Sequence, residues 1–229
     1  MKDKIIYIEE APVRLIPEKR RSIRLIWDRR ERLIRCFHPC SLSGAVLKNF
    51  LEKRKRRLLA LYSQAFFLGE GASLLYGGKE YRLSSEAPET GKTFFRDDLA
   101  MTIRTSCLNE GDLFFTRWKE YLDQEAPLCF HEKIGFWEDK TGEKASRWRF
   151  RPMRSRWGSA SSLRAITLNT LLVMAPGDVV DYVILHELTH LKVADHSFRF
   201  WKEVARFMPD FQHCRSWLRE NGNKILSLY

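Results

Sequence analysis

The sequence has few cysteines, and their arrangement excludes a disulfide-stabilised class of protein. Cysteine occurs five times among 229 residues, and both the odd number and the irregular spacing are unlike the framework of a secreted disulfide-rich domain. We therefore expect a reducing, cytoplasmic environment. Residues 36–40 contain two cysteines and a histidine, but no second ligand pair follows at zinc-finger spacing, so this segment alone does not make a closed tetrahedral site.

Long apolar runs are also absent, as are internal repeats. No stretch is long enough to cross a bilayer, and the N-terminus mixes acids, bases and apolar residues without a secretory signal pattern. We expect no membrane association. The composition, 44% hydrophobic and 30% charged, is typical of a globular protein with a sizeable core and excludes a disordered chain. We expect one cooperative unit over residues 1–229.

Positive charge is concentrated at one end of the chain. Residues 1–57 hold 17 Lys and Arg against 7 Asp and Glu, whereas residues 58–229 hold 23 against 22. Such a concentration indicates a surface for nucleic acid or an acidic partner. It is equally consistent with a solvated surface on which arginines cover apolar neighbours. A second, shorter basic stripe is formed by Arg147, Arg149 and Arg151, which share one face of an expected strand.

Hydrophobic periodicity predicts a strand-rich region over residues 1–90. Residues 5–8, 22–27 and 33–37 alternate as strands do, and residues 42–67 have the three-and-four spacing of one amphipathic helix with a basic outer face. A hairpin is expected to turn at Gly77-Gly78, and residues 84–92 are the best linker candidate.

Residues 91–229 are expected to form the catalytic region of an α+β protein. A helix is predicted over residues 97–123, with aspartates at its start and an end before Pro127. Strands are predicted at residues 134–137, 148–150 and 165–169, followed by two helices.

The segment that indicates chemistry is an HExxH motif formed by His186, Glu187 and His190. Apolar residues at helical spacing surround it, and on a helix the two histidines lie one turn apart on the same face, about 6 Å from each other at the base of their side chains. Two imidazoles at this spacing can share a zinc ion. Glu187 lies one position around the helix, where it can act as general base on a zinc-bound water.

A catalytic zinc normally has three protein ligands and an exchangeable water, so a third ligand is required. His196 is the best candidate, because a helix break between Leu191 and Asp195 would bring it back to the other histidines. Ser197 would then cap a new helix. Other candidates for the third ligand are Asp195, Glu203 and His213, and Asp181 or Asp210 are candidates for orienting the ligating imidazoles.

These motifs together resemble the YgjP-like metallopeptidases, zincins distantly related to SprT-type and Wss1-like proteases. The similar segments are residues 156–159, 166–169, 181–191, 196–197, 200–201 and 208–210. The resemblance implies one zinc ion per chain, with His186, His190 and His196 as its ligands and Glu187 as the catalytic acid and base. It also implies a zincin-like C-terminal half, and it extends to the basic N-terminal region only in general layout. Ala160 departs from the family, because a cysteine is expected there.

The sequence thus predicts a zinc-dependent metallopeptidase that acts on protein or peptide substrates. Residues 157–159 and 166–169 would offer a strand edge to the substrate, although Trp157 and Ile166 are equally expected as core residues. An alternative is a nucleic-acid-associated protein recruited through the basic N-terminal region, and the two activities are compatible. A purely structural zinc is disfavoured because the spacing offers three ligands rather than four.

Overall fold

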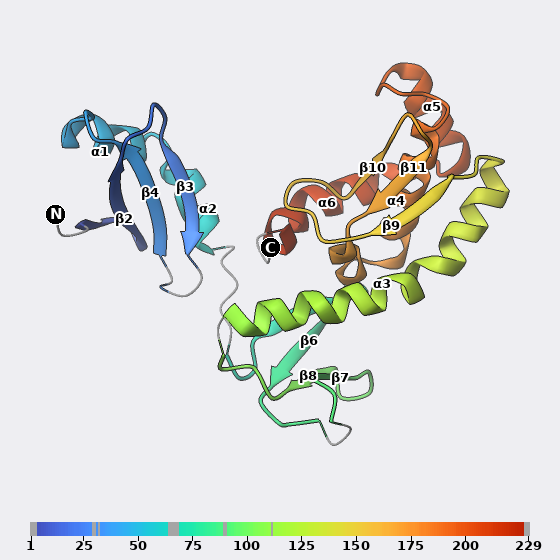
Figure 1. Cartoon of the computed structure of the whole chain (residues 1–229), viewed down its shortest axis with the longest axis horizontal. Coiled ribbons are helices and arrows are strands. Elements are labelled where there is room, and N and C mark those ends of the chain that lie inside the picture. The colour runs from blue at the N-terminus through green and yellow to red at the C-terminus, as the bar shows by residue number, and fades with distance from the viewer. Residues whose placement is uncertain are drawn as a thin grey trace. The chain divides into compact units, whose positions relative to one another are not determined.

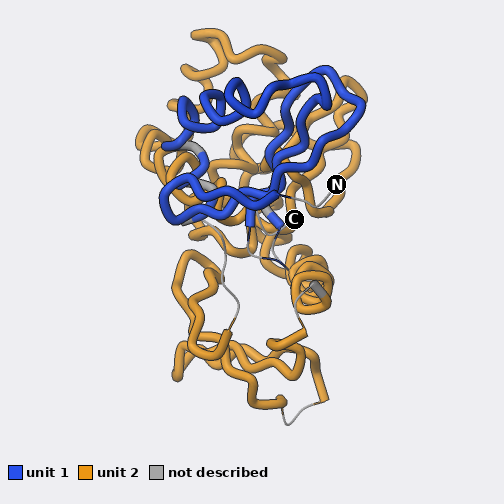
Figure 2. The backbone as a smooth tube through the Cα atoms, turned by 90° about the vertical axis from the view of Figure 1, so that its left-hand side faces the viewer, with its two compact units in different colours: residues 1–67 blue, residues 68–229 orange. Residues whose placement is uncertain are grey.

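The computed structural model describes residues 4–28, 31, 33–63, 69–88, 91–110 and 112–226. The chain divides into two compact units, Met1–Phe67 and Leu68–Tyr229, which Figure 2 shows in different colours. The division we expected after residue 90 differs from this one. The hairpin after Leu68 belongs with the second unit, because the backbone N–H of Gly77 donates to the carbonyl of Val173.

The first unit is a four-stranded sheet packed against two helices. In spatial order its strands are β1 (Lys4–Ile8), β2 (Ala11–Glu18), β4 (Leu33–Pro39) and β3 (Arg24–Asp28). Its helices are α1 (Gly44–Glu52) and α2 (Lys55–Ser63). The core lies between sheet and helices and is formed by Ile8, Ala11, Val13, Ile34, Cys36, Leu47, Leu51 and Leu58. The three expected strands are confirmed.

Two features of this unit differ from the expectation. The sequence analysis missed β2, whose Pro12 and Pro17 obscure a strand pattern because proline cannot donate to a ladder. The single helix expected over residues 42–67 is instead α1 and α2, separated at residues 53–54, and part of the expected range lies outside the described residues.

Some of the positive charge in this unit is paired within the fold. Ion pairs join Arg14 to Glu31, Arg35 to Asp28 and Lys55 to Glu9. Arginine side chains also cover apolar groups, since the guanidinium of Arg54 lies 3.7 Å from the centre of the Phe50 ring.

The second unit begins with a small sheet in the order β5-β6-β8-β7. Its strands are β5 (Ser73–Tyr76), β6 (Lys79–Ser84), β7 (Phe94–Asp97) and β8 (Thr102–Thr105). The hairpin at Gly77-Gly78 is confirmed. The helix predicted from residue 97 is wrong over its first part, because Asp97 ends a strand. Its Oδ1 accepts from the N–H groups of Leu99 and Ala100 and so closes the β7–β8 turn.

A long helix, α3 (Asp112–Thr141), follows this sheet. Pro127 lies inside it rather than beyond its end, and Figure 1 shows the helix bending along its length, as an internal proline requires. The strand predicted at residues 134–137 is wrong. Ile134 and Trp137 are buried while the two residues between them are exposed, which is the spacing of a helix face.

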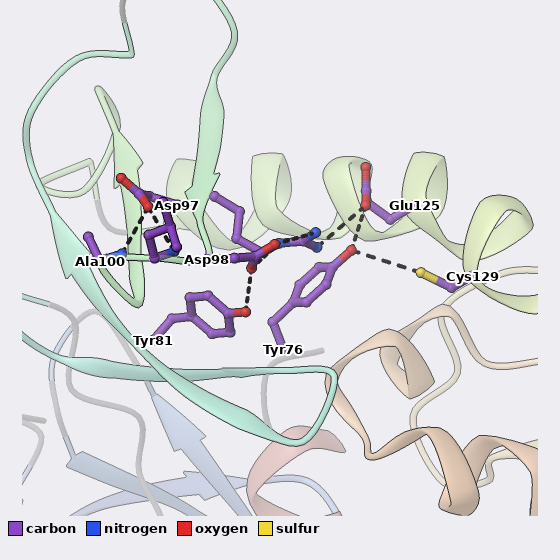
Figure 3. A network of polar contacts seen from close by, with 9 residues as sticks. Tyr76, Tyr81, Asp97, Asp98, Ala100, Glu125 and Cys129 are labelled. Carbon is purple, nitrogen blue, oxygen red and sulfur yellow. Dashed lines mark hydrogen bonds and ion pairs between the residues drawn. The ribbon is translucent and has the colours of Figure 1, made fainter.

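A polar network fastens the small sheet to α3 (Figure 3). The hydroxyl of Tyr76 donates to Glu125 of α3 and lies 3.9 Å from the Cys129 sulfur. The hydroxyl of Tyr81 donates to Asp98 at 2.6 Å. Arg96 lies over the Tyr76 ring, 4.1 Å from its centre, and pairs with Asp98. The small sheet is therefore held to the helix through the hydroxyl of the buried Tyr76, while the hydroxyl of Tyr81 bonds within the sheet's own β7–β8 turn.

The remainder of the second unit is a three-stranded sheet backed by helices (Figure 1). The strands β10 (Gly158–Ala160), β11 (Ala165–Leu168) and β9 (Arg147–Phe150) lie in this spatial order, with β11 antiparallel to β10 and parallel to β9. The helices are the 3-10 helix η1 (Thr170–Met174), α4 (Gly177–His190), α5 (Phe198–Phe207) and α6 (Phe211–Leu226). Helix α3 packs on β9, and α4 packs on β10 and β11. The strands expected at residues 148–150 and 165–169 are confirmed, as is the mixed α+β class.

The hairpin of the small sheet also fixes the start of α4. The N–H groups of Gly77 and Gly78 donate to the carbonyls of Val173 and Met174 in η1. Gly78 has φ +77°, and a Cβ atom on it would lie 2.5 Å from Cγ of Pro176, the N-cap of α4. Only glycine fits this contact. None of the helices in the described part of the chain is long and apolar enough to cross a membrane.

Candidate metal centre

The HExxH motif lies on helix α4, which is largely buried. The helix begins after its N-cap, Pro176, and the acidic Asp178 lies in its first turn. Val180, Ile184 and Leu188 are buried, as the apolar stripe predicts. His186 and His190 follow each other by one turn, and their Nε2 atoms lie 3.2 Å apart.

Helix α4 ends at His190, early enough for His196 to turn back toward the other two histidines. Leu191 is the C-cap of α4, and α5 begins with Ser197 at its N-cap position, although the Ser197 side chain makes no capping hydrogen bond. The intervening turn returns His196 to the other two histidines, with its Nε2 3.1 Å from Nε2 of His186. The expected break between Leu191 and Asp195 is confirmed.

The three imidazoles fit a zinc ion. Nitrogen donors about 2.0–2.1 Å from a common tetrahedral centre lie about 3.3 Å from one another, close to the 3.2 Å and 3.1 Å between His186 and its two neighbours. The Nδ1 atom of His190 lies 3.1 Å from the carbonyl oxygen of Val193, to which its N–H donates, so Nε2 keeps its lone pair for a metal.

Burial and mutual proximity also favour the uncharged forms of His186 and His190. Burial, followed by the charges of His190 and His196, lowers the pKa of His186 to about 3. The pKa of His190 is lowered as well, mainly by burial. Neutral imidazoles are the form that binds a metal. The hydroxyl of Tyr182, one turn earlier on α4, lies 3.4 Å from the His186 Nδ1 atom and can fix its orientation.

Glu187 lies beside the histidines with its carboxylate almost fully buried. Its side chain is directed toward β10, where Gly158 leaves the space that it occupies. Burial raises the pKa of Glu187 to about 7. A hydrogen bond from the Ala160 backbone N–H and the charge of Arg156 act in the opposite direction and lower this pKa. A carboxylate with this pKa can both accept and release a proton near neutral pH.

One cavity of about 490 Å³ is lined by the three histidines and by Glu187. One wall comes from α4 and the turn after it, and the other from β10 with the residues on either side. The lining residues are Arg156, Gly158, Ser159, Ala160, Ser161, Ser162, His186, Glu187, His190, Ala194 and His196.

The other candidates for the third ligand do not join this cluster. Asp195 accepts from the N–H of Ser197. Glu203 pairs with Lys192 at 2.6 Å. His213 pairs with Asp178 at 2.7 Å, at the opposite end of α4.

The acids expected to orient the imidazoles have other roles. Asp181 accepts from Lys133 at 2.8 Å and from the indole of Trp137 at 2.9 Å, and so holds α4 to α3. The Asp210 carbonyl accepts from His213. The backbone carbonyl of Val193 and the hydroxyl of Tyr182 contact the site histidines instead.

Asn169 is fully buried and organises the loop before β10. Its side-chain oxygen accepts from the N–H groups of Met153 and Leu171, and its amide donates to the carbonyls of Met153 and Arg156. It therefore positions the wall of the cavity rather than the reacting atoms.

Two residues of the site had been missed. Phe200 is fully buried, and its ring centre lies 4.8, 4.5 and 4.8 Å from those of His186, His190 and His196. It is the apolar floor of the cluster. Gly158 gave no signal beyond the family resemblance, since its role depends on a strand meeting a helix that is distant in sequence.

Comparison with known proteins identifies the family. The YgjP-like family model, described as "YgjP-like, metallopeptidase domain", matches residues 21–221. The metallopeptidase zymogen abylysin of Pyrococcus abyssi is 25% identical over 40% of this chain and 91% of its own, with a TM-score of 0.36. The zymogen jannalysin of Methanocaldococcus jannaschii is 18% identical over 40% of this chain and 94% of its own, with the same TM-score of 0.36. No curated protein matches the chain. Because the family match runs from the first unit to α6, the chain belongs to the YgjP-like metallopeptidase family.

Proposed function

We propose that this chain is a zinc-dependent peptidase in which His186, His190 and His196 hold one zinc ion and Glu187 is the general base. The observation that supports it most strongly is the convergence of three Nε2 atoms next to a buried carboxylate in one open cavity. A zinc ion held there would supply Lewis acidity, lowering the pKa of a bound water and polarising a peptide carbonyl.

The residues of the chain provide the proton transfers. The carboxylate of Glu187, with its pKa raised to about 7, accepts a proton from the attacking water and returns it to the leaving amine. The Ala160 N–H keeps one side of the carboxylate fixed by a hydrogen bond. Val193 and Phe200 keep the imidazoles in place during this exchange.

The arrangement also supports a zincin-type mode of substrate binding. Strand β10 is an edge of the sheet and forms a wall of the cavity. An extended peptide can pair with such an edge, which gives backbone hydrogen bonds with little demand on sequence. Ile166 is fully buried, so it belongs to the core, and Trp157 packs near Gly222 of α6. The substrate edge is therefore assigned to β10 alone.

A purely structural zinc fits the site less well. The cluster contains three donors within the described residues, whereas a closed structural site needs four. The three donors line the same cavity as Glu187.

The five cysteines bear on where the enzyme would work. All are free, and burial raises the pKa of Cys36, Cys129 and Cys214. Free thiols of this kind favour a reducing compartment such as the cytoplasm.

The variant Glu187→Gln tests the proposal directly. It keeps the shape of the side chain but removes the base, so hydrolysis of a fluorescently labelled, unfolded casein should fall by at least about 100-fold. Zinc content should stay near one ion per chain. Glu220→Gln, an exposed change on α6, is the matched control and should leave both unchanged. Wild-type hydrolysis by Glu187→Gln would refute the general-base assignment, and hydrolysis that does not depend on zinc would refute the zinc mechanism.

A further inference from the structure

The three-stranded sheet of the second unit has one face covered by helices and one face open. Trp148 and Phe150 of β9 point toward α3, since the Trp148 indole donates to Glu138 and the Phe150 ring contacts Phe130. Ile166 and Leu168 of β11 are fully buried on the same side. Because side chains alternate along a strand, the residues between these positions form the opposite face.

That opposite face carries arginine side chains and hydroxyl groups. Arg147, Arg149 and Arg151 project from β9 and its continuation, and all three are exposed. The register places Arg149 beside Thr167 of β11, and Thr167 beside Ser159 of β10. We call these five residues the outer arginine face. Alternate residues of a strand are about 6.6 Å apart, so Arg147 and Arg149 leave β9 at this spacing, and Arg151 follows directly after its end.

The side chains of Arg147, Arg149 and Arg151 are available to a partner. Within the described residues, no ion pair, hydrogen bond or ring contact engages them. In the first unit, Arg14, Arg35 and Lys55 are paired with acids, whereas Arg21, Arg24 and Arg56 are exposed. The outer arginine face differs from this unit in that its arginines share one face of a single strand and its continuation, beside the candidate metal centre.

The chemistry of the face favours phosphate over protein. A protein interface needs apolar or aromatic anchors at its centre, and the outer arginine face has none. Guanidinium groups match phosphate oxygens with two parallel hydrogen bonds, and hydroxyl groups donate to the same oxygens. The lack of aromatic side chains also means that bases are not stacked on this face, so its contacts are expected with the phosphate backbone, which carries no sequence information.

We propose that the outer arginine face binds the phosphate backbone of nucleic acid without sequence preference. Ser159 belongs both to this face and to the lining of the cavity, so bound nucleic acid would lie next to the candidate metal centre. This binding goes beyond the proposed peptidase function and does not depend on it.

The test is fluorescence anisotropy of the full chain with labelled mixed-sequence DNA, single-stranded and duplex, between about 50 and 200 mM salt. One variant combines Arg147→Gln, Arg149→Gln and Arg151→Gln. The matched control combines Arg21→Gln, Arg24→Gln and Arg56→Gln, which removes the same charge from exposed positions of the first unit.

The face variant should bind at least about tenfold more weakly at the lowest salt, and the slope of log affinity against log salt for duplex DNA should fall by about 2 to 3. The control should stay within about twofold. A third variant with lysine at the three positions keeps the charge and should retain most of the binding, which separates loss of charge from loss of fold. If the glutamine variant does not fold, Arg149→Gln alone should weaken binding about threefold.

Three results would overturn the proposal. One is no binding of either DNA at the lowest salt, and another is equal weakening in the face variant and its control. The third is displacement of DNA by polyglutamate at equal charge concentration, which would assign the face to an acidic protein. Glu187→Gln should bind DNA as the unaltered chain does, so failure of the peptidase proposal is seen separately.

Discussion

A Cβ atom on Gly158 would lie 2.5 Å from Oε1 of Glu187 and 2.6 Å from its Cγ. These distances are too short for any real contact, so the buried carboxylate occupies the space that a side chain on β10 would fill. The absence of a side chain at residue 158 is thus a condition for the observed position of Glu187. The strand and the helix that carry the two residues meet only in the folded protein.

The first prediction follows from this contact. Gly158→Ala must displace either Glu187 or β10, so peptide hydrolysis should fall by at least about 100-fold while zinc binding by the histidines persists. Gly135→Ala on the exposed side of α3, where a Cβ meets nothing within 4 Å, is the control. Both variants are compared by initial rates and zinc content, and wild-type rates for Gly158→Ala would show that Glu187 is not confined as described.

A second prediction concerns the hairpin that meets the start of α4. Gly78→Ala combines a positive φ of +77° with a contact of 2.5 Å to Pro176, and should lower the free energy of unfolding by about 2 to 4 kcal/mol. Gly77→Ala has φ +58° but open space around its Cβ, so its loss should be smaller, about 1 kcal/mol. Urea unfolding measures both, and equal losses would argue against the Pro176 contact.

The third prediction concerns Asn169. In Asn169→Asp the buried side chain loses its two donated hydrogen bonds to the carbonyls of Met153 and Arg156. Unfolding free energy should fall by about 3 kcal/mol, since two buried acceptors are left facing a carboxylate. Asn223→Asp, at an exposed position of α6, is the control and should change stability by less than about 0.5 kcal/mol. An unchanged free energy of unfolding in Asn169→Asp would contradict the assigned network.

A pH-dependent effect is expected at the ion pair of Asp178 and His213. The Asp178 carboxylate, followed by the Asp210 carbonyl, raises the pKa of His213 above its usual value near 6.5. A raised pKa stabilises the fold fully below the unfolded value and loses this effect as pH rises through the folded value. The stability difference between the unaltered chain and His213→Gln should therefore be larger at about pH 5.5 than at about pH 8.5. It should be small, because the pair is exposed. A difference that grows with pH would contradict it.

The sequence predicted the features that depend on local spacing. His186 and His190 meet because four residues make about one helical turn, and the break before His196 was required by ligand reach. Strands with clear alternation, such as residues 33–37, were also found.

Features that depend on tertiary context were missed. Asp97 resembles the start of a helix, but its carboxylate closes a turn between two strands. Pro127 resembles a helix end, yet α3 continues through it, with the fully buried Leu122 and Phe130 on either side. Gly158 and Phe200 belong to the site only through contacts with α4, which no pattern along the chain records.

The central claim is that three histidines hold one zinc ion with an open position. The most direct measurement is zinc content per chain, by elemental analysis of protein purified without added metal, for the unaltered chain and for His196→Ala. Our account predicts about one zinc in the unaltered chain and a large loss in the variant, with folding retained by circular dichroism. No zinc in the unaltered chain after supplementation, or full zinc in His196→Ala, would contradict it.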